Sequence, residues 1–344
     1  MRELLRLLEM RLEELHQKVA EASQVFVLTD ENVAPLWLSE TLHWLGCKSS
    51  VNIVIAADEQ QKNLKNTQKI WRTLTKHQAD RSAMLVNLGG GVITDLGGFA
   101  ASTYKRGIPF INVPTTLLGM VDAAIGGKTG IDFDGFKNQL GTFAEPLDVV
   151  ISPIYLSTLP ERELLSGLSE MMKYGFTHDP NLLKVNKDNY QDYILRAGEI
   201  KRMVVKNDPF DEGSRKVLNF GHTLGHAIES YSLTTKQPLL HGEAVALGMG
   251  AALWLSVKER GLDVEVLQSY MKQLTVLLSG VDGLPAETDV KPILKYLSQD
   301  KKNKNGQTRF VLLDRVGSPV WDVEVKLDRI EEALEYILDK ASIR

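Results

Sequence analysis

Two of the seven histidines of the chain, His222 and His226, lie four residues apart in the segment LNFGHTLGHAIES (218–230). Four residues is close to one turn of an α-helix, so both imidazoles would share one helix face. Arg215 and Asn219 precede them at helical spacing, which predicts a stripe of four polar groups on a single helix. Because that helix also carries apolar residues, the stripe should face solvent or a polar cleft.

Two further residues could complete a metal site with this stripe. His241, in PLLHGEAV, is expected to begin a helix after a loop, which leaves one side of its ring accessible. Glu170, in SGLSEMMKYGF, lies among apolar neighbours, an unusual setting for a solvated carboxylate. Two imidazoles and one carboxylate leave open coordination positions, which is typical of a catalytic zinc. A capping or core hydrogen bond explains each residue singly, but not the whole set.

Two known motifs are not matched. The zincin motif H-E-x-x-H fails because Thr223 follows the first histidine, which disfavours a protease of that class. The P-loop motif fails at GGKTG (126–130), because Asp122 occupies the position of its first glycine. Lys128 still lies in a glycine-rich loop where it could meet an anion.

A glycine loop, NLGGGVITDLGGF (87–99), lies between a predicted strand and a predicted helix. Consecutive glycines let the backbone approach a ligand and expose N–H groups at the helix N-terminus, a geometry that suits a pyrophosphate. The G-x-G-x-x-G fingerprint is incomplete because Thr94 replaces its last glycine, and a tight strand–helix turn explains the loop equally well. Asp30, at the end of the first predicted strand, could bind a ribose.

The composition is that of an ordinary globular protein. The chain has 344 residues, a net charge of -4 and a single cysteine, Cys47. This length favours two domains, and the charge gives no reason to expect nucleic acid as a partner. One cysteine excludes an intramolecular disulfide and a cysteine-based zinc knuckle.

The N-terminal residues 1–23 are leucine-rich but charged every few residues, so they predict an amphipathic helix and not a signal peptide. No stretch approaches the roughly 18 apolar residues of a membrane span. We therefore expect a cytoplasmic protein with no membrane partner.

The order of predicted elements divides the chain near residue 153. Up to that point strands and helices alternate, which indicates an α/β domain with a mostly parallel sheet. Strands are expected at 24–33, 50–60 and 109–116, helices at 36–47 and 62–79, and a strand, the glycine loop and a helix in that order within 83–104. Beyond it, helical periodicity dominates. Helices are expected at 161–176, 194–208, 215–231, 242–261, 264–280 and 327–341, with a β-like stretch at 308–317.

Several long segments together resemble the 3-dehydroquinate synthase family of the sugar phosphate cyclase superfamily. They are GGGVITDLGGFAASTYKRGI, VPTTLLGMVDAAIGGKTGID, KNQLGTF, LPERELLSGLSEMMKYG and RKVLNFGHTLGHAIE followed by HGEAVALGM. The resemblance runs from about 30 to 309. It implies a Rossmann-like NAD-binding domain over 1–153 and a mainly α-helical metal- and substrate-binding domain over 154–344.

The resemblance also implies an activity. Members of this family convert the seven-carbon phosphate DAHP to 3-dehydroquinate with loss of inorganic phosphate, a carbon–oxygen lyase reaction of the shikimate pathway of aromatic amino acid biosynthesis. They use NAD catalytically together with a divalent metal, and they are typically homodimers. Zinc and cobalt both suit two imidazoles and a carboxylate.

The family pattern assigns roles to individual residues. The implied metal ligands are Glu170, His222 and His241. The implied catalytic residues are Lys128, Asn138, Arg215, Asn219 and His226. The implied substrate-binding residues are Arg106, which would come from the neighbouring subunit, Asp122, Lys137, Lys173, Lys201 and Lys302. The implied NAD-binding residues are Asp30, Asn32, Glu59, Lys62, Gly90, Gly91, Val92, Asp95, Thr115, Thr116 and Thr158.

One departure from the family pattern is visible in DEQQK (58–62), where Asp58 replaces a glycine. Glu59 and Lys62 are kept. We therefore expect a slightly different loop conformation around the adenosine end of NAD.

Three alternatives remain at this point. Other sugar phosphate cyclases, such as 2-deoxy-scyllo-inosose synthase, share NAD, metal and the early chemistry but act on substrates without a carboxylate. Lys201 and Arg215 together favour a carboxylate-bearing substrate. A metal-dependent polyol dehydrogenase would release NADH. A non-enzymatic metal-binding or interaction protein would not need so many convergent polar groups.

Overall fold

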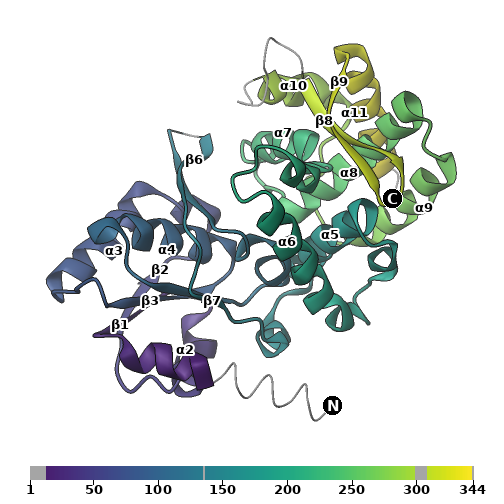
Figure 1. Cartoon of the computed structure of the whole chain (residues 1–344). Helices are drawn as coiled ribbons and strands as arrows, with labels where there is room; N and C mark the ends of the chain where they lie inside the picture. The colour runs from purple at the N-terminus through teal and green to yellow at the C-terminus, as the bar shows by residue number, and fades with distance from the viewer. Residues whose placement is uncertain (1–12, 135, 299–307, 343–344) are drawn as a thin grey trace. The chain divides into compact units, whose positions relative to one another are not determined.

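The computed structural model describes residues 13–134, 136–298 and 308–342 (Figure 1). It divides into two compact units, Met1–Leu159 and Pro160–Arg344. The boundary expected from the sequence, after residue 153, falls at the start of the short 3-10 helix η4 (Pro153–Thr158). Two side chains of η4 form hydrogen bonds with residues of the first unit. Tyr155 pairs with Thr41 at 2.9 Å, and Thr158 accepts from Trp37 at 2.8 Å. The six residues of η4 therefore belong to the first unit.

A five-stranded parallel sheet forms the centre of the first unit. Its strands are β1 (Val25–Asp30), β2 (Val51–Ile55), β3 (Met84–Gly89), β4 (Phe110–Pro114) and β7 (Asp148–Val149). Their order is β2-β1-β3-β4-β7, with every neighbouring pair parallel. The β-branched runs that predicted the first four strands are mostly buried, as a sheet covered on both faces requires. The predicted α/β architecture is confirmed.

Helices cover both faces of this sheet. Figure 1 shows α3 (Leu64–Lys76) and α4 (Gly91–Thr103) on one face and α2 (Ala34–Trp44) on the other. Apolar side chains of α3, α4 and the strands form one core cluster that includes Phe26, Ile70 and Leu96. From β1 the chain adds β2 on one side, and it then adds β3, β4 and β7 on the other side, so the order of strands reverses between β1 and β3. Open α/β sheets bind their ligands at such a switch point.

Smaller elements complete the first unit. These are η1 (Glu59–Gln61), η2 (Tyr104–Arg106), the π-helical turn η3 (Gly119–Ala123) and an antiparallel hairpin of β5 (Lys128–Phe133) and β6 (Phe136–Phe143), which the sequence analysis did not predict. Of the predicted N-terminal helix, residues 13–21 are helical and bury Leu15 and Val19, while 1–12 lie outside the described residues.

The second unit is mainly helical, as predicted. Its helices are α5 (Glu161–Thr177), α6 (Ile194–Asn207), α7 (His222–Ser232), α8 (His241–Arg260), α9 (Val264–Leu277), α10 (Val290–Ser298) and α11 (Leu327–Ser342), with the short turns η5 (Pro180–Lys184), η6 (Tyr190–Tyr193), η7 (Ser214–Asn219) and η8 (Glu287–Asp289). The β-like stretch is one strand of a hairpin, β8 (Thr308–Arg315) and β9 (Ser318–Val325). In the described part of the chain, no helix has both the length and the apolar character to cross a membrane.

Helix α8 forms the centre of the second unit. It is buried from Gly242 to Leu253 and packs against α5, α7, α9 and α11. A helix that is apolar on all sides must be covered all round, and these neighbours cover it. At Gly248 a Cβ atom would collide with the carbonyl oxygen of Gly221, so α7 approaches α8 more closely than any larger residue permits.

The prediction of one helix over 215–231 is wrong. The 3-10 helix η7 ends at Asn219, and α7 begins at His222. Between them Gly221 has a φ of +79°, a left-handed conformation that interrupts the helix and that glycine adopts without a steric penalty. Arg215 and Asn219 are therefore not on the helix that carries His222 and His226.

We predict that Gly248→Ala destabilises the second unit, because the added methyl group must push α7 away from α8. The free energy of unfolding, measured by denaturant titration, should fall by about 1–3 kcal/mol. Lys272→Ala, an exposed change on the neighbouring helix α9, should stay within about 0.5 kcal/mol of the parent. Equal stability of Gly248→Ala and the parent would contradict the close packing of these helices.

Candidate metal centre and active site

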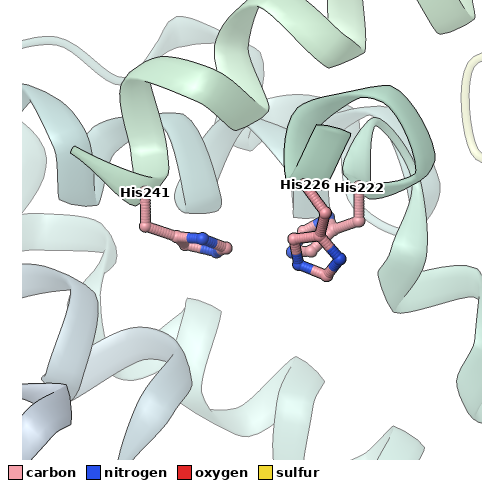
Figure 2. Close-up of side chains that lie close together, drawn as sticks. All are labelled: His222, His226 and His241. Atoms are coloured by element: carbon pink, nitrogen blue, oxygen red, sulfur yellow. The ribbon is translucent and has the colours of Figure 1, made fainter. Parts of the chain in front are cut away.

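Three helices of the second unit bring four potential metal ligands together. Glu170 comes from α5, His222 and His226 from α7, and His241 from the first position of α8. The Glu170 side chain is fully buried, with Oε1 3.4 Å from Nε2 of His222 and 3.6 Å from Nε2 of His241. Figure 2 shows His222 and His226 on one helix, with His241 opposite them. A carboxylate oxygen and two imidazole nitrogens therefore face one point.

The second ring nitrogen of each proposed histidine ligand has its own partner. His222 Nδ1 lies 3.1 Å from the carbonyl oxygen of Phe220, and His241 Nδ1 lies 3.4 Å from Oε2 of Glu229. A hydrogen bond at Nδ1 fixes the tautomer and orients the ring. Both rings therefore direct Nε2 toward Glu170, which is the arrangement that a metal ligand needs.

The two rings differ in how they hold a proton. Burial keeps the pKa of His222 well below its usual range, so this imidazole is neutral. Burial also lowers the pKa of His241, but the charges of Glu229 and Glu170 outweigh burial and raise the pKa to about 10. A divalent cation would replace this proton as the positive charge between the carboxylates.

The donor set fits a divalent metal in two combinations. The ligand atoms of His222, His226 and His241 all lie within 4.8 Å of one another. The set implied by the family pattern uses Glu170 in place of His226. Glu170 is wholly buried against two of the rings, whereas His226 is only half-buried. This difference favours Glu170 as the ligand and leaves His226 accessible to a substrate.

Lys173 lies against Glu170 on the same helix, α5. Lys173 Nζ forms an ion pair with Glu170 Oε2 and lies 5.0 Å from the centroid of the Tyr174 ring. Lys173 is itself buried. The structure therefore places this predicted substrate residue directly against the proposed ligand, where its charge compensates the buried carboxylate.

Two other predicted basic residues of the second unit are buried, Lys201 on α6 and Arg215 on η7. Arg215 donates from Nη1 to the carbonyl oxygen of Pro209 at 2.8 Å. Its loop is held by Asp208, whose carboxylate accepts from the backbone N–H groups of Glu212, Gly213 and Arg215 at 3.0, 2.7 and 2.9 Å. Sequence reasoning missed Asp208, although an aspartate directly before a proline is a usual turn signal.

In the first unit, predicted NAD residues follow the carboxyl ends of four neighbouring strands. Asp30 ends β1, Glu59 follows β2, Gly90 follows β3 and Thr115 follows β4. Gly90 is the N-cap of α4, so the backbone N–H groups at the start of this helix are directed toward that edge. Asp30, after β1, and Gly90, after β3, therefore lie on the two sides of the point where the strand order reverses.

Lys62 connects several of the predicted residues at this edge. Its buried Nζ lies 3.2 Å from Glu59, 3.4 Å from Asp95 and 3.9 Å from Asp132. Burial alone would lower the pKa of Lys62, but the three carboxylates outweigh it and raise the pKa, so the ammonium stays charged. Asp132, on β5, was not predicted as a site residue, because nothing in the sequence marks its proximity to Lys62.

Other predicted residues lie near this group or apart from it. Lys137 pairs with Glu59 at 3.1 Å, and the N–H of Asn138, whose φ is +50°, donates to Asp132 at 2.8 Å. Asp58 caps η1 by accepting from the N–H of Gln60 at 2.8 Å, so this departure stabilises the turn before Lys62. Among the other predicted first-unit residues, the N–H of Asn32 donates to Asp30 at 2.9 Å and Thr158 accepts from Trp37 at 2.8 Å. Arg106 is the last residue of η2, Asp122 lies in η3 and Lys128 begins β5. Lys302 lies outside the described residues.

Comparison with known proteins agrees with the fold. The architecture is shared with two synthases of known structure. A 2-deoxy-scyllo-inosose synthase complexed with carbaglucose-6-phosphate, NAD+ and Co2+ has a TM-score of 0.83 at 23% identity over 94% of both chains. A 2-epi-5-epi-valiolone synthase from Streptomyces hygroscopicus, with NAD+ and Zn2+ bound, has a TM-score of 0.82 at 26% identity, covering 93% of this chain and 92% of that one. The fold is therefore dehydroquinate synthase-like.

The family follows from sequence models and curated relatives. Residues 52–166 match the 3-dehydroquinate synthase N-terminal model, and 167–303 match the C-terminal model. The 3-dehydroquinate synthase of Parabacteroides distasonis is 40% identical over 85% of this chain and 84% of its own length. That of Acidithiobacillus ferrooxidans is 39% identical over 92% and 89%. The chain belongs to the 3-dehydroquinate synthase family of lyases.

We predict that His241→Ala abolishes zinc retention, because one of two imidazole ligands is removed, whereas His226→Ala keeps the metal and loses rate. Metal content after dialysis, measured by elemental analysis, together with turnover distinguishes the two variants. If both variants retained zinc equally well, the ligand assignment would be wrong.

We also predict a pH-dependent effect of Asp208→Asn. Hydrogen bonds from the Arg215 backbone N–H and its neighbours hold the pKa of Asp208 below its usual range. The stability that they contribute is therefore present above the unfolded pKa of about 3.9 and is lost as the pH falls through the folded value. Thermal melts should show a larger difference between parent and variant at pH 7 than near pH 3. A difference that does not change with pH would contradict this role.

Proposed function

We propose that the chain converts DAHP to 3-dehydroquinate and inorganic phosphate, using NAD catalytically together with a divalent metal. The observation that carries this proposal is the convergence of Glu170, His222 and His241 on one point, in a chain of the 3-dehydroquinate synthase family. When bound, NAD supplies reversible hydride transfer, and the metal supplies positive charge beside the reacting hydroxyl group.

In this proposal His226 exchanges protons with the substrate. Its ring centroid lies 5.2 Å from that of His222 and 5.8 Å from that of His241. It is therefore next to the proposed ligands, and it is more accessible than His222. An imidazole whose ordinary pKa is about 6.5 can accept and return a proton near neutral pH.

The basic residues of the second unit suit the two anionic groups of the substrate. Lys173, Lys201 and Arg215 are buried, so their charges act where water screens them little. Arg215 can bind a planar carboxylate through two parallel hydrogen bonds, and the lysines supply compact charges for phosphate. The remaining assignments, to Arg106, Asp122, Lys128, Lys137, Asn138, Asn219 and Lys302, stay predictions from the family motif.

The NAD site in this proposal lies at the carboxyl edge of the parallel sheet. The pyrophosphate would bind the N–H groups at the start of α4, beside Gly90 and Gly91, and Asp30 would accept from a ribose hydroxyl. The Asp30 carboxylate already accepts from the N–H groups of Asn32 and Val33, both at 2.9 Å, which fixes its position.

We further propose a cytoplasmic homodimer in which Arg106 enters the site of the second copy. Arg106 is exposed, and both it and Lys105 have left-handed φ angles, 65° and 48°, which are unusual for large side chains. Strained backbone at an exposed basic residue suggests a requirement outside the fold of the single chain.

The reaction itself is tested with purified protein, NAD and zinc. DAHP should yield one phosphate per turnover with no net accumulation of NADH, followed by phosphate assay and absorbance at the NADH band. Steady NADH formation would point to a polyol dehydrogenase. Phosphate release from glucose 6-phosphate but not from DAHP would point to an inosose-type cyclase.

Mixed dimers test the placement of Arg106. Neither Arg106→Ala nor His226→Ala homodimers should turn over DAHP at the normal rate. A heterodimer of the two variants contains one site with both residues intact only if Arg106 acts across the dimer. Recovery of activity on mixing is therefore expected, and no recovery in a verified heterodimer would contradict the proposal.

A further inference from the structure

Glu229, on α7, is a buried carboxylate to which sequence reasoning gave no role. Glu229 is only 3% exposed, and its Oε2 lies 3.4 Å from Nδ1 of His241. On the other side of the same ring, Nε2 of His241 lies 3.6 Å from Glu170 Oε1. The imidazole is thus placed between two carboxylates from two different helices.

This arrangement determines which nitrogen can bind a metal. A carboxylate accepts hydrogen bonds, so a proton on Nδ1 is stabilised by Glu229. With Nδ1 carrying the proton, Nε2 keeps its lone pair and faces Glu170 and His222. A carboxylate behind a metal-binding imidazole also increases the basicity of the ring and so strengthens the metal bond.

We propose that Glu229 is a positioning residue that orients His241 as a ligand of the divalent metal. This inference rests on the proposed ligand set of Glu170, His222 and His241. His222 needs no such side chain, because the backbone carbonyl of Phe220 occupies the equivalent place at 3.1 Å from its Nδ1. Glu229 therefore provides for His241 what the backbone provides for His222.

The backbone of His241 is held separately from its ring. Glu243 accepts from the N–H of Leu240 at 2.7 Å and so caps the start of α8. Arg162, on α5, binds both oxygens of Glu243 at 2.6 and 2.8 Å. Because these contacts fix the helix start, removing Glu229 should release the imidazole without moving α8.

The test compares Glu229→Ala and Glu229→Gln with the parent and with Tyr270→Phe. Tyr270 is a matched control, because it is buried and donates to the Ala246 carbonyl on α8 at 2.8 Å, away from the ring. Zinc affinity is measured by competition with a chromophoric chelator, and ligand geometry by the visible spectrum of the cobalt-substituted protein. Circular dichroism verifies folding.

Glu229→Ala should bind zinc roughly 10–100-fold more weakly than the parent and shift the cobalt spectrum. Glu229→Gln, whose amide oxygen still accepts a hydrogen bond, should show a smaller loss of zinc affinity. If the alanine variant does not fold, the zinc affinity and cobalt spectrum of Glu229→Gln test the proposal. Tyr270→Phe should match the parent in both measurements.

Unchanged zinc affinity and cobalt spectrum in a folded Glu229 variant would overturn the proposal. His241→Ala, measured alongside, separates this failure from a failure of the ligand set. If His241→Ala loses zinc while the Glu229 variants do not, only the role of Glu229 is wrong. If His241→Ala also binds zinc normally, the ligand set itself is wrong.

Discussion

A carboxylate with no access to solvent lies at the centre of the helical unit, and the packing around it follows from that constraint. An isolated charge in a protein interior is far more costly than an unmade hydrogen bond. Glu170 therefore requires cations or proton donors on every side. Lys173 of its own helix and the protonated ring of His241 supply positive charge, and a divalent metal held between Glu170, His222 and His241 would supply more. Both α7 and α8 therefore begin beside the middle of α5.

Small residues make this convergence geometrically feasible. A Cβ at Gly242 would collide with the Ser166 carbonyl of α5, so the residue next to His241 must be glycine for α8 to start this close to Glu170. Gly248 allows the corresponding approach of α7 to α8. In the first unit the requirement is different, since the parallel sheet itself brings Asp30 and Gly90 to one edge. Ligand positions there follow from strand order, whereas in the helical unit they follow from side-chain size.

The sequence patterns predicted those elements whose formation depends on residues close together in the sequence. Apolar β-branched runs gave the strands up to β4, and glycines after β3 marked the start of α4. Helical spacing also continued through Gly221, so the sequence suggested one helix where a left-handed residue separates two. The β5–β6 hairpin was missed because FKNQLGTF lacks the alternation of a half-buried strand.

The site residues likewise divide into those that a sequence motif marks and those that only the folded structure brings together. The residues within recognisable motifs could be named from the sequence, and the structure brings Glu170, His222 and His241 together as the family pattern implies. Asp132, Asp208 and Glu229 could not be found in this way. Asp132 and Glu229 act on partners 70 and 12 positions away, Lys62 and His241, and Asp208 acts on the backbone of a loop. No spacing rule connects such pairs, because only the folded chain makes them neighbours.

The most direct test of the account is X-ray absorption at the zinc edge of the metal-loaded protein. Multiple scattering from imidazole rings counts histidine ligands, and the total number of nitrogen and oxygen atoms bound to the metal gives the remaining ligands by difference. The account predicts two imidazoles and at least one oxygen ligand, with the same count in His226→Ala. Three imidazoles in the parent, falling to two in His226→Ala, would show that His226 is a ligand and would contradict it.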